Sequence, residues 1–334
     1  MKRGMNAVEK VTVVIPTFNS EKYIGSLIEK LKQLNNVKFI LIDDGSSDNT
    51  PKILKNIKDE RFNILLNDHK GVSFARNLGI KLCDTEYISF IDSDDMINVP
   101  TFQKIVNNLA IEAIYDVVSI GNSFEQHDYF ELDKLDLTEQ LLMLKTNIDI
   151  LPGPVSKMYK ASFLKANRIF FPGEIVVGED MLFNVEVIGA ATSLCVLSTP
   201  FYLCRNNPGS VTRQQKYNVE SNQIAFLDQL QMRLQKIFSR EDFSQIFQAK
   251  LISSWIEISY ISFSNNHDVS KLNKLRNRFI PRIKFTQLLG NNMRTTQKVL
   301  GILIWFRQYL LIKILFSFKH MKKNKPEVAN FSLL

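Results

Sequence analysis

Aspartates gather at several points in the first part of this chain, each time directly after an apolar run. Asp43 and Asp44 end one such run, and Asp92, Ser93 and Asp94 follow another. Carboxylates that lie this close repel one another, and a hard divalent cation relieves the repulsion. Mg²⁺ is usually held by one or two protein carboxylates together with the phosphates of a substrate. The Asp92–Ser93–Asp94 pattern therefore predicts a site for Mg²⁺ or Mn²⁺ and a phosphorylated ligand.

The phosphates of such a ligand would have no glycine-rich cradle, because the sequence has neither a GxxxxGK loop nor a GxGxxG loop. Their charge has to be neutralised by the metal and by a nearby Arg or Lys, for which Arg76 is the leading candidate. The cysteines form no CxxC pair and the histidines show no HExxH spacing. These patterns argue against a zinc site.

The elements that would position these residues follow from the alternation of apolar and amphipathic runs. Strands are expected at 11–18, 38–44, 63–67, 87–92 and 116–122, and helices at 21–34, 50–58, 72–82 and 101–112. Apolar runs rich in Val and Ile are typical of strands buried on both faces. Their alternation with helices indicates a Rossmann-like α/β fold with a mostly parallel sheet flanked by helices. Because ligands of such sheets bind beyond the carboxyl ends of the strands, the polar clusters should meet at one edge.

The second half of the chain has a different character. Further along, a helix is expected at 179–190, a strand at 193–197, and helical periodicity from 219 to 265.

The chain has 334 residues, more than one average domain, and its 45% hydrophobic and 23% charged composition excludes bulk disorder. The predicted division is an α/β domain at 8–215, a helical C-terminal domain at 216–298 and a basic amphipathic helix at 299–325.

Charge is distributed unevenly along the chain. Residues 1–200 hold 21 Lys and Arg against 27 Asp and Glu, whereas residues 201–334 hold 21 against 7. The basic second part requires an anionic partner, and the main candidates are nucleic acid and a membrane surface. Residues 1–10 lack the apolar stretch of a secretory signal, so a cytoplasmic location is expected.

Residues 299–318 form a nearly continuous apolar run, close to the length of about 20 residues that spans a bilayer. Arg307 and Lys313 interrupt the run, and a charge at the centre of a membrane is costly. A helix that lies on an anionic membrane surface, with both side chains reaching the headgroups, therefore fits better than a membrane span. A core helix of the C-terminal domain or an oligomer contact is the alternative.

Five motifs follow one another along the chain: PTFN at 16–19, DDGSSDNT at 43–50, GVSFARN at 71–77, DSDD at 92–95 and GED at 178–180. In this order they resemble the family 2 glycosyltransferases, which have the GT-A fold. The resemblance covers about residues 10–215. It implies that Asp180 is the general base and that Glu179 supports it or binds the acceptor.

The resemblance also implies a set of donor-binding residues. Asp94 and Asp92 would bind the metal, with Asp92 also facing the ribose or sugar. At the nucleotide, Pro16 and Phe18 would line the pocket, and Asp44 would accept a hydrogen bond from uracil N3–H. Asn67 and Arg76 would lie near the nucleobase and the phosphates, and Ser93 would lie within the acidic motif. Arg205 and Ser210 would belong to a loop over the diphosphate.

The implied activity is transfer of a hexosyl or N-acetylhexosaminyl group from a nucleotide sugar, with UDP favoured, to a hydroxyl of a glycan or lipid-linked acceptor. This places the enzyme in bacterial surface-polysaccharide assembly, peripherally at the inner face of the cell membrane. Direct displacement needs one base, so inversion is expected.

Two other functions stay open from the residues alone. A sugar nucleotidyltransferase also needs paired carboxylates and a metal, but usually has a glycine-rich loop that residues 16–21 lack. A basic nucleic-acid-binding protein would use the tail, which has no zinc or helix-turn-helix signature, so no nucleic-acid partner is expected. An oligomer is compatible with the sequence.

Overall fold

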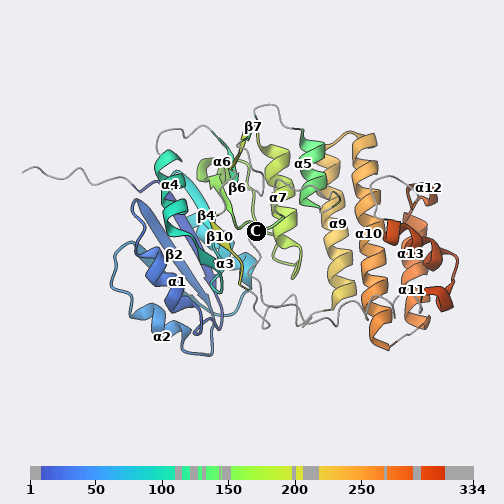
Figure 1. Cartoon of the computed structure of the whole chain (residues 1–334), viewed down its shortest axis with the longest axis horizontal. Coiled ribbons are helices and arrows are strands. Elements are labelled where there is room, and N and C mark those ends of the chain that lie inside the picture. Colours follow the sequence, from blue (N-terminus) through green and yellow to red (C-terminus); the bar gives the residue numbers. More distant parts are fainter. Residues whose placement is uncertain are drawn as a thin grey trace, which may run out of the picture. The chain divides into compact units, whose positions relative to one another are not determined.

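The computed structural model of the chain describes residues 9–109, 115–120, 127–129, 133–142, 144, 152–197, 201–205, 218–266, 269–288 and 295–312. The chain divides into two compact units (Figure 1). The first comprises Met1–Leu141, Asn147–Gln214 and Phe331–Leu334, and the second comprises Leu142–Thr146 and Gln215–Asn330.

A mixed sheet of eight strands forms the centre of the first unit, in the order β3-β2-β1-β4-β8-β6-β9-β7. Neighbouring strands are parallel from β3 to β4 and between β6 and β9, whereas β8 runs against both β4 and β6, and β7 runs against β9. The predicted α/β fold is confirmed. The strands are β1 (Val11–Thr17), β2 (Val37–Asp44), β3 (Phe62–Asn67), β4 (Tyr87–Phe90), β6 (Val117–Ile120), β7 (His127–Tyr129), β8 (Lys157–Lys160) and β9 (Leu194–Leu197).

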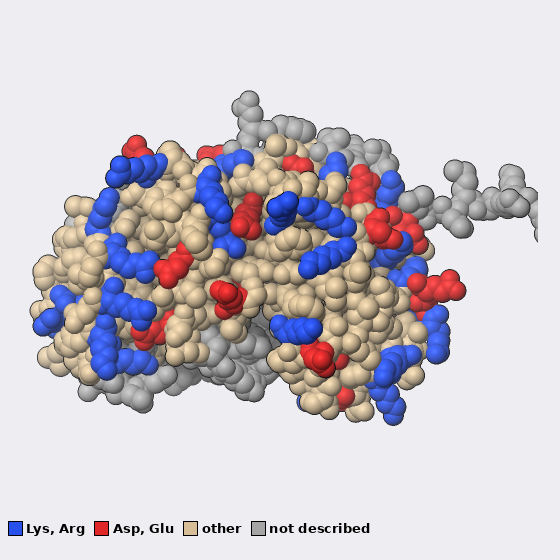
Figure 2. Space-filling model, turned by 180° about the vertical axis from the view of Figure 1, so that it is seen from behind, with Lys and Arg blue, Asp and Glu red and all other residues tan. Residues whose placement is uncertain are grey.

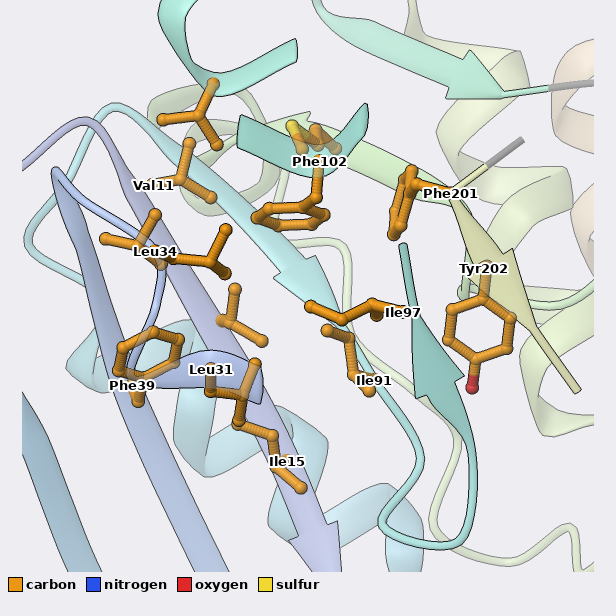
Figure 3. Close-up of a cluster of buried hydrophobic side chains, with 14 of the residues drawn as sticks. Val11, Ile15, Leu31, Leu34, Phe39, Ile91, Ile97, Phe102, Phe201 and Tyr202 are labelled. Atoms are coloured by element: carbon orange, nitrogen blue, oxygen red, sulfur yellow. The ribbon is translucent and has the colours of Figure 1, made fainter. Parts of the chain in front are cut away.

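Helices cover both faces of this sheet, and each face has its own apolar core. The helices are α1 (Ile24–Leu31), α2 (Thr50–Lys55), α3 (Val72–Leu82), α4 (Val99–Leu109), α5 (Lys134–Leu141), α6 (Ala161–Ala166) and α7 (Glu179–Ala190). Side chains of α1, α2 and α4 pack on one face, where Phe39, Leu31 and Phe102 are fully buried (Figure 3). Side chains of α3, α5, α6 and α7 pack on the other face. Burial on both faces explains why the strands are continuous apolar runs.

Helix α3 approaches the sheet closely because of one glycine. A Cβ at Gly79 would lie 2.5 Å from both methyl carbons of Val14 on β1, so any larger residue would push the helix outward. Arg76 is one turn earlier on the same helix. Gly79 therefore sets the depth at which Arg76 meets the strand ends.

A two-stranded antiparallel sheet, formed by β5 (Met96–Ile97) and β10 (Tyr202–Leu203), joins distant parts of the first unit. Phe201 packs edge to face on Phe102, with the ring centroids 4.7 Å apart. The chain that follows β10 is thereby held beside the turn that follows β4.

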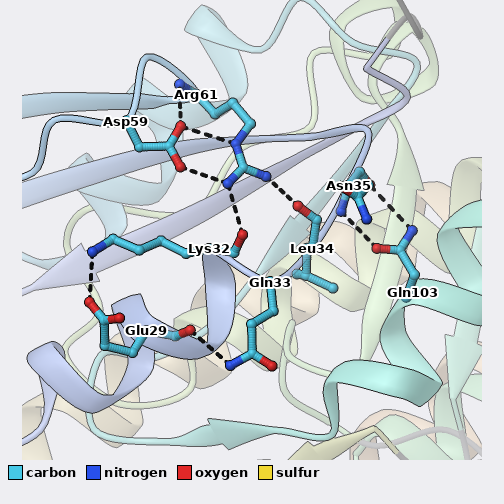
Figure 4. A network of polar contacts seen from close by, with 8 residues as sticks. All are labelled: Glu29, Lys32, Gln33, Leu34, Asn35, Asp59, Arg61 and Gln103. Atoms are coloured by element: carbon cyan, nitrogen blue, oxygen red, sulfur yellow. Dashed lines mark hydrogen bonds and ion pairs between the residues drawn. The ribbon is translucent and has the colours of Figure 1, made fainter.

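At the amino edge of the large sheet, an ion pair and several backbone groups form a separate polar network (Figure 4). Both guanidinium nitrogens of one side of Arg61 contact the Asp59 carboxylate, at 3.0 and 2.6 Å. Arg61 also donates to the carbonyls of Lys32 and Leu34, just after α1. These carbonyls lie beyond the last turn of the helix and need donors from elsewhere. The network therefore closes the connection from α1 to β2.

The second unit is helical in its described residues. It contains α9 (Val219–Ile237), α10 (Arg240–Asn266), α11 (Val269–Phe279), a 3₁₀ turn η1 (Ile280–Arg282), α12 (Phe285–Leu288) and α13 (Thr295–Trp305). Helices α9 and α10 lie side by side (Figure 1), and Leu230, Trp255 and Leu275 are buried between the helices. In the view of Figure 2, basic side chains are dispersed over the surface rather than gathered into one patch.

The apolar tail differs from the single helix predicted across 299–325. Arg307 has a left-handed backbone with φ of 58°. Its N–H donates to Ile304 O at 3.2 Å, and the N–H of Gln308 donates to Leu303 O at 2.8 Å. This pair of hydrogen bonds is a Schellman motif, which ends α13 and redirects the chain. The prediction of one continuous helix is therefore wrong within the described residues.

The tail also contributes to the core of the helical unit. Ile304 and Ile312 are fully buried, and the ring of Trp305 lies 5.1 Å from that of Phe285. Phe306 and Leu310, by contrast, are exposed. The alternative of a core helix thus holds for the inner side of this segment. Among the residues that the structure describes, no helix is long and apolar enough to cross a membrane.

Candidate functional site

The carboxyl edge of the sheet brings together most of the residues singled out from the sequence. The register pairs Thr17 with Asp43, and Asp44 with Asn67, so β1, β2 and β3 end side by side. Arg76 bridges from α3 to Asp92 after β4. The polar clusters therefore meet at one edge, as the parallel topology predicts.

The end of β1 forms one side of this edge. Pro16 is buried and paired in register with Ile42, and it lies beyond Val14, the last residue that pairs with β4. Its missing N–H therefore faces the side where no strand continues, which is where a central strand tolerates proline. Phe18 is 47% exposed, with its ring 4.7 Å from that of His69. An exposed aromatic face beside an imidazole can stack on a planar base.

The two aspartates at the end of β2 have different partners. Asp43 accepts hydrogen bonds from the N–H and the hydroxyl of Ser46, at 3.1 and 2.6 Å. Asp44 accepts from the backbone N–H groups of Lys70 and Gly71, at 2.7 and 2.9 Å. Asp44 therefore ties the start of α3 to the sheet. Its predicted contact with the uracil ring stays a prediction.

Asn67 ends β3 and carries an unsatisfied donor. Its Nδ2 is buried and has no hydrogen-bond partner among the described residues. A buried unsatisfied amide is costly, and a ligand is one of the few groups that can satisfy it. This observation supports a polar ligand next to Asp44, its neighbour in the register.

The acidic motif after β4 is a tight turn in which the N–H of Asp95 donates to Asp92 O at 3.1 Å. The Ser93 hydroxyl is buried and lies 2.7 Å from that of Ser20, which links the turn to the loop after β1. Asp92 is 37% exposed at its side chain, and Asp94 is half-buried. The turn thus leaves Asp92 and Asp94 partly exposed and buries the hydroxyl between them.

A divalent cation fits this donor set only in part. In the described part of the chain, no group of three or more His, Cys, Asp and Glu side chains could hold a metal. Asp92 and Asp94 offer two accessible carboxylates of the hard oxygen type that Mg²⁺ and Mn²⁺ take. Two carboxylates match the usual Mg²⁺ arrangement, in which substrate phosphates supply further ligands.

Asp95 has a different role from the two preceding aspartates. It is buried, accepts from the Tyr202 hydroxyl at 2.6 Å and accepts from the N–H of Arg205 at 2.7 Å. Burial raises the pKa of Asp95 to about 6, although the bond from Tyr202 opposes the shift. Asp95 therefore anchors the segment after β10 to the acidic turn.

Arg205 follows this anchor, and its guanidinium lies 4.9 Å from the centre of the Tyr23 ring. The predicted phosphate contact of Arg205 stays a prediction. Ser210 lies outside the described residues.

Arg76 connects the acidic turn to helix α7. It is buried, and two of its guanidinium nitrogens each lie 3.0 Å from a carboxylate, one of Asp92 and one of Glu179. Its third nitrogen, Nε, is buried without a partner among the described residues. Burial acts to lower the pKa of Arg76, but the charges of Asp92 and Glu179 outweigh it and raise the pKa. The sequence identified Arg76 as a phosphate-neutralising group, whereas the structure shows it shared between two carboxylates.

Glu179 and Asp180 open helix α7 after Gly178, whose φ of 100° permits the sharp entry. Burial, together with the charge of Asp180, raises the pKa of Glu179 to about 7, against the opposing charge of Arg76. Burial also raises the pKa of Asp180, again opposed by Arg76. Glu179 is buried and Asp180 half-buried, and two adjacent carboxylates with raised pKa values hold a proton close to neutral pH. Such a group can serve as a general base.

Sequence reasoning missed three contributors to the site: Lys157, Tyr202 and His69. Lys157 begins β8 and is fully buried, and burial lowers its pKa to about 7 against the opposing charge of Asp180. Tyr202 holds Asp95, and His69 lies against Phe18. The short run KMYK at 157–160 has no strong strand pattern, so the sequence carried no signal that brings Lys157 to this edge.

Carboxylates and an unsatisfied amide at the carboxyl edge of an open α/β sheet are typical of the ligand-binding α/β domains. Residues 12–166 match the family Glycosyl transferase family 2. This match over residues 12–166 confirms the resemblance seen in the motifs of that segment.

Curated relatives agree with this assignment. EpsH of Bacillus subtilis (strain 168) is 29% identical over 224 residues, 63% of this chain and 65% of its own length. The poly(ribitol-phosphate) β-N-acetylglucosaminyltransferase TarS of Staphylococcus aureus (strain Mu50 / ATCC 700699) is 30% identical over 206 residues, 58% of this chain and 35% of its own. The matches thus span less than two thirds of these relatives. They agree with the family match of residues 12–166.

Solved structures support the fold. The crystal structure of S. aureus TarS 1-349 in complex with UDP-GlcNAc superposes with a TM-score of 0.68 and 19% identity, covering 97% of both chains. The crystal structure of the same fragment in complex with UDP has a TM-score of 0.64 and 20% identity. At this identity the likeness confirms the predicted GT-A fold with its helical C-terminal region.

Proposed function

We propose that this chain transfers a hexose or N-acetylhexosamine from a UDP-sugar to a hydroxyl of a glycan or lipid-linked acceptor in surface-polysaccharide assembly. The observation that carries the proposal is the Arg76 bridge. It joins Asp92, on the donor side, to Glu179, which neighbours the proposed general base Asp180. The family assignment supports it, as do relatives named as N-acetylglucosaminyltransferases.

The nucleotide binds across the ends of β1 to β3. The exposed ring of Phe18, backed by His69, stacks on the base. Asn67 Nδ2, which has no partner in the described part of the chain, donates to the base or ribose, beside Asp44. Arg205 contacts the diphosphate, because its backbone N–H is anchored to Asp95 in the acidic turn.

Asp92 and Asp94 hold Mg²⁺ or Mn²⁺ in this proposal. When bound, the cation supplies positive charge to the leaving diphosphate. Ser93 keeps the two carboxylates in place through its bond to Ser20. Arg76 holds Asp92 from the protein side.

Asp180 takes the proton from the acceptor hydroxyl as that oxygen attacks the anomeric carbon. The neighbouring carboxylate, Glu179, is bound by Arg76 and is therefore unsuited to attack the sugar itself. With one base and no second nucleophile, the reaction is a direct displacement that inverts the anomeric carbon. Glu179 keeps Arg76, whose positive charge acts on Asp180, beside the start of α7.

The chain also contacts the anionic inner surface of the cell membrane in this proposal, through the segment after α13. Phe306, Leu310 and Leu311 are 56%, 73% and 48% exposed, and Arg307 is exposed among them. Apolar side chains next to a cation suit a headgroup layer. Replacing Leu310 and Leu311 by Ser should abolish co-sedimentation with phosphatidylglycerol vesicles. Equal binding to phosphatidylcholine vesicles would contradict the electrostatic part.

The central test measures UDP release from a panel of UDP-sugars in the presence of Mn²⁺. We expect release from at least one donor, lost in Asp94→Ala and kept in Asp84→Ala, which removes an exposed aspartate paired with Lys38. Absence of UDP-sugar binding with Mn²⁺ present would refute the proposal. Pyrophosphate production would instead support a sugar nucleotidyltransferase.

A further inference from the structure

The two oxygens of the Asp180 carboxylate have different surroundings. Oδ1 accepts the N–H of Met181 at 2.7 Å. Oδ2 receives no hydrogen bond from any residue that the structure describes. The chain next to Oδ2 is Gly153: a Cβ built there would lie 3.6 Å from Oδ2 and 3.7 Å from a methyl carbon of Val155. The oxygen without a donor thus faces a residue that has no side chain.

The backbone at this position does not require glycine. Gly153 lies outside the left-handed region, unlike Gly45, Gly71 and Gly178. It stands between Pro152 and Pro154, and a residue before proline takes an extended conformation that any amino acid adopts. Since neither φ nor a steric clash demands glycine here, what glycine contributes is space beside Oδ2.

Three buried side chains, two from strand β8 and one from helix α7, hold this bare stretch of backbone. Lys157 Nζ donates to Gly153 O at 2.6 Å. Asn184 Nδ2 donates to Pro152 O at 2.8 Å and is itself held by the Tyr159 hydroxyl, 2.8 Å from Asn184 Oδ1. Lys157, Tyr159 and Asn184 are all fully buried. The gap between residue 153 and Asp180 therefore has a fixed width.

We propose that Gly153 is a specificity-determining residue, and that the acceptor hydroxyl reaches Asp180 Oδ2 across its bare backbone. This inference rests on the proposed function. The hydroxyl proton passes to Oδ2, the hydroxyl oxygen bonds to the anomeric carbon, and the bond to the diphosphate breaks with its electron pair leaving on the diphosphate. A hydroxyl bonded to Oδ2 stands about 2.7 Å from it. A methyl at 153 competes for that space, and a larger side chain closes it.

Lys157 and Asn184 are positioning residues in this arrangement, because they act through the backbone of residues 152 and 153. The acceptor class that fits is an alcohol with little bulk around the reacting carbon, such as a primary or unhindered secondary hydroxyl. Bulk at the hydroxyl-bearing carbon would meet the Gly153 backbone and Val155.

The test compares wild type, Gly153→Ala and Gly153→Val, with Gly25→Ala as the matched control, because a Cβ at Gly25 meets nothing within 4 Å. UDP-N-acetylglucosamine with Mn²⁺ is the donor, and water and glycerol are the acceptor probes. UDP affinity is measured separately by calorimetry. Donor binding should stay within about twofold in all variants, since position 153 faces Oδ2 and not the nucleotide.

We expect the Ala variant to lower glycerol transfer about tenfold relative to hydrolysis, since one added methyl in a fitted site has effects of this order. The Val variant should lower hydrolysis as well, by about 100-fold. The inference would be overturned if both variants hydrolysed the donor and transferred the sugar at wild-type rates. A fall in UDP affinity that accompanies the fall in rate would also overturn it. If Val does not fold, judged by its melting curve, the Ala variant decides.

Failure of the proposed function would look different. In that case the wild type itself neither binds UDP nor releases it from any donor, and the inference falls with it. If the wild type binds UDP and hydrolyses the donor without using glycerol, the rates of hydrolysis in the two variants decide the inference alone.

Discussion

The two edges of the large sheet differ in how completely their charged groups are hydrogen-bonded. At the amino edge, Arg61 forms a two-pronged pair with Asp59 and donates to two backbone carbonyls (Figure 4). At the carboxyl edge, Arg76 is shared between Asp92 and Glu179 while its Nε has no partner among the described residues. The hydrogen-bonding groups of Arg61 are thus satisfied, whereas one donor of Arg76 is not.

The pKa directions follow the same division. Hydrogen bonding by Arg61 lowers the pKa of Asp59. Burial raises the pKa of Glu179 to about 7 and that of Asp95 to about 6, even though each has a close partner. A carboxylate stabilises the fold when its partners favour the charged form more than burial disfavours it. A carboxylate for which burial has the larger effect is typical of a functional site. The difference indicates which edge of the sheet reacts.

The largest effect should come from replacing the proposed general base, Asp180. Asp180→Asn keeps the shape of the side chain and removes its ability to accept a proton, so we expect sugar transfer to fall by about 10²–10⁴-fold. UDP affinity should be unchanged. Asp59→Asn at the amino edge is the matched control and should transfer at the wild-type rate. Similar losses in both variants would erase the proposed distinction between the edges.

Replacing Arg76, which is shared between Asp92 and Glu179, should lower the stability of the fold. Arg76→Met leaves two carboxylates without their partner, and removal of one member of a buried ion pair costs about 3–5 kcal/mol. Chemical unfolding would measure the loss. Arg76→Lys keeps one charge but loses the fork that reaches both carboxylates, so it should recover stability only in part. Full stability in Arg76→Met would mean that the bridge is not structural.

The activity should depend on pH through the Glu179–Asp180 pair. Below about pH 7 the pair binds a proton, and a protonated Asp180 cannot accept the hydroxyl proton. The rate should therefore rise with pH and level off above the pKa. Glu179→Gln removes one of the two coupled charges and should move the rise to lower pH. A flat kcat/KM profile in the wild type would contradict this assignment of the base.

The smallest effect should come from the amino edge. Arg61→Met removes a half-exposed ion pair and two bonds to backbone carbonyls, for which we expect a loss of about 1–2 kcal/mol in the free energy of unfolding. The kinetic constants should not change. A fall in kcat with no fall in stability would show that this edge communicates with the site.

Much of the first half of the fold was predictable from residue pattern. The strand ending at Asp44 and the helices Val72–Leu82 and Glu179–Ala190 have strong periodicity, and the structure gives them these ends. The gathering of Asp44, Asn67 and Asp92 at one edge followed from parallel topology alone. Patterns this clear arise because both faces of the sheet are buried.

The partners of individual side chains were not predictable. Whether Asp43 or Asp44 meets the start of α3 depends on which face of β2 each one takes, and neighbours on a strand take opposite faces. Nothing in the spacing of Arg76 revealed its bond to Glu179, over a hundred residues away. In the tail, composition could not reveal the left-handed turn at Arg307, because arginine rarely adopts that conformation.

Strand β8 runs against its neighbour β4, so its first residue, Lys157, lies at the same edge as the last residues of β4. The loops that carry donor residues leave their strands at this edge, whereas the chain before β8 arrives there. In the proposed function, the donor and the acceptor are therefore bound by segments that run in opposite directions and lie far apart in the sequence. Under the proposed function, exchange of residues 152–156 between relatives should then alter which alcohol is glycosylated without changing nucleotide recognition.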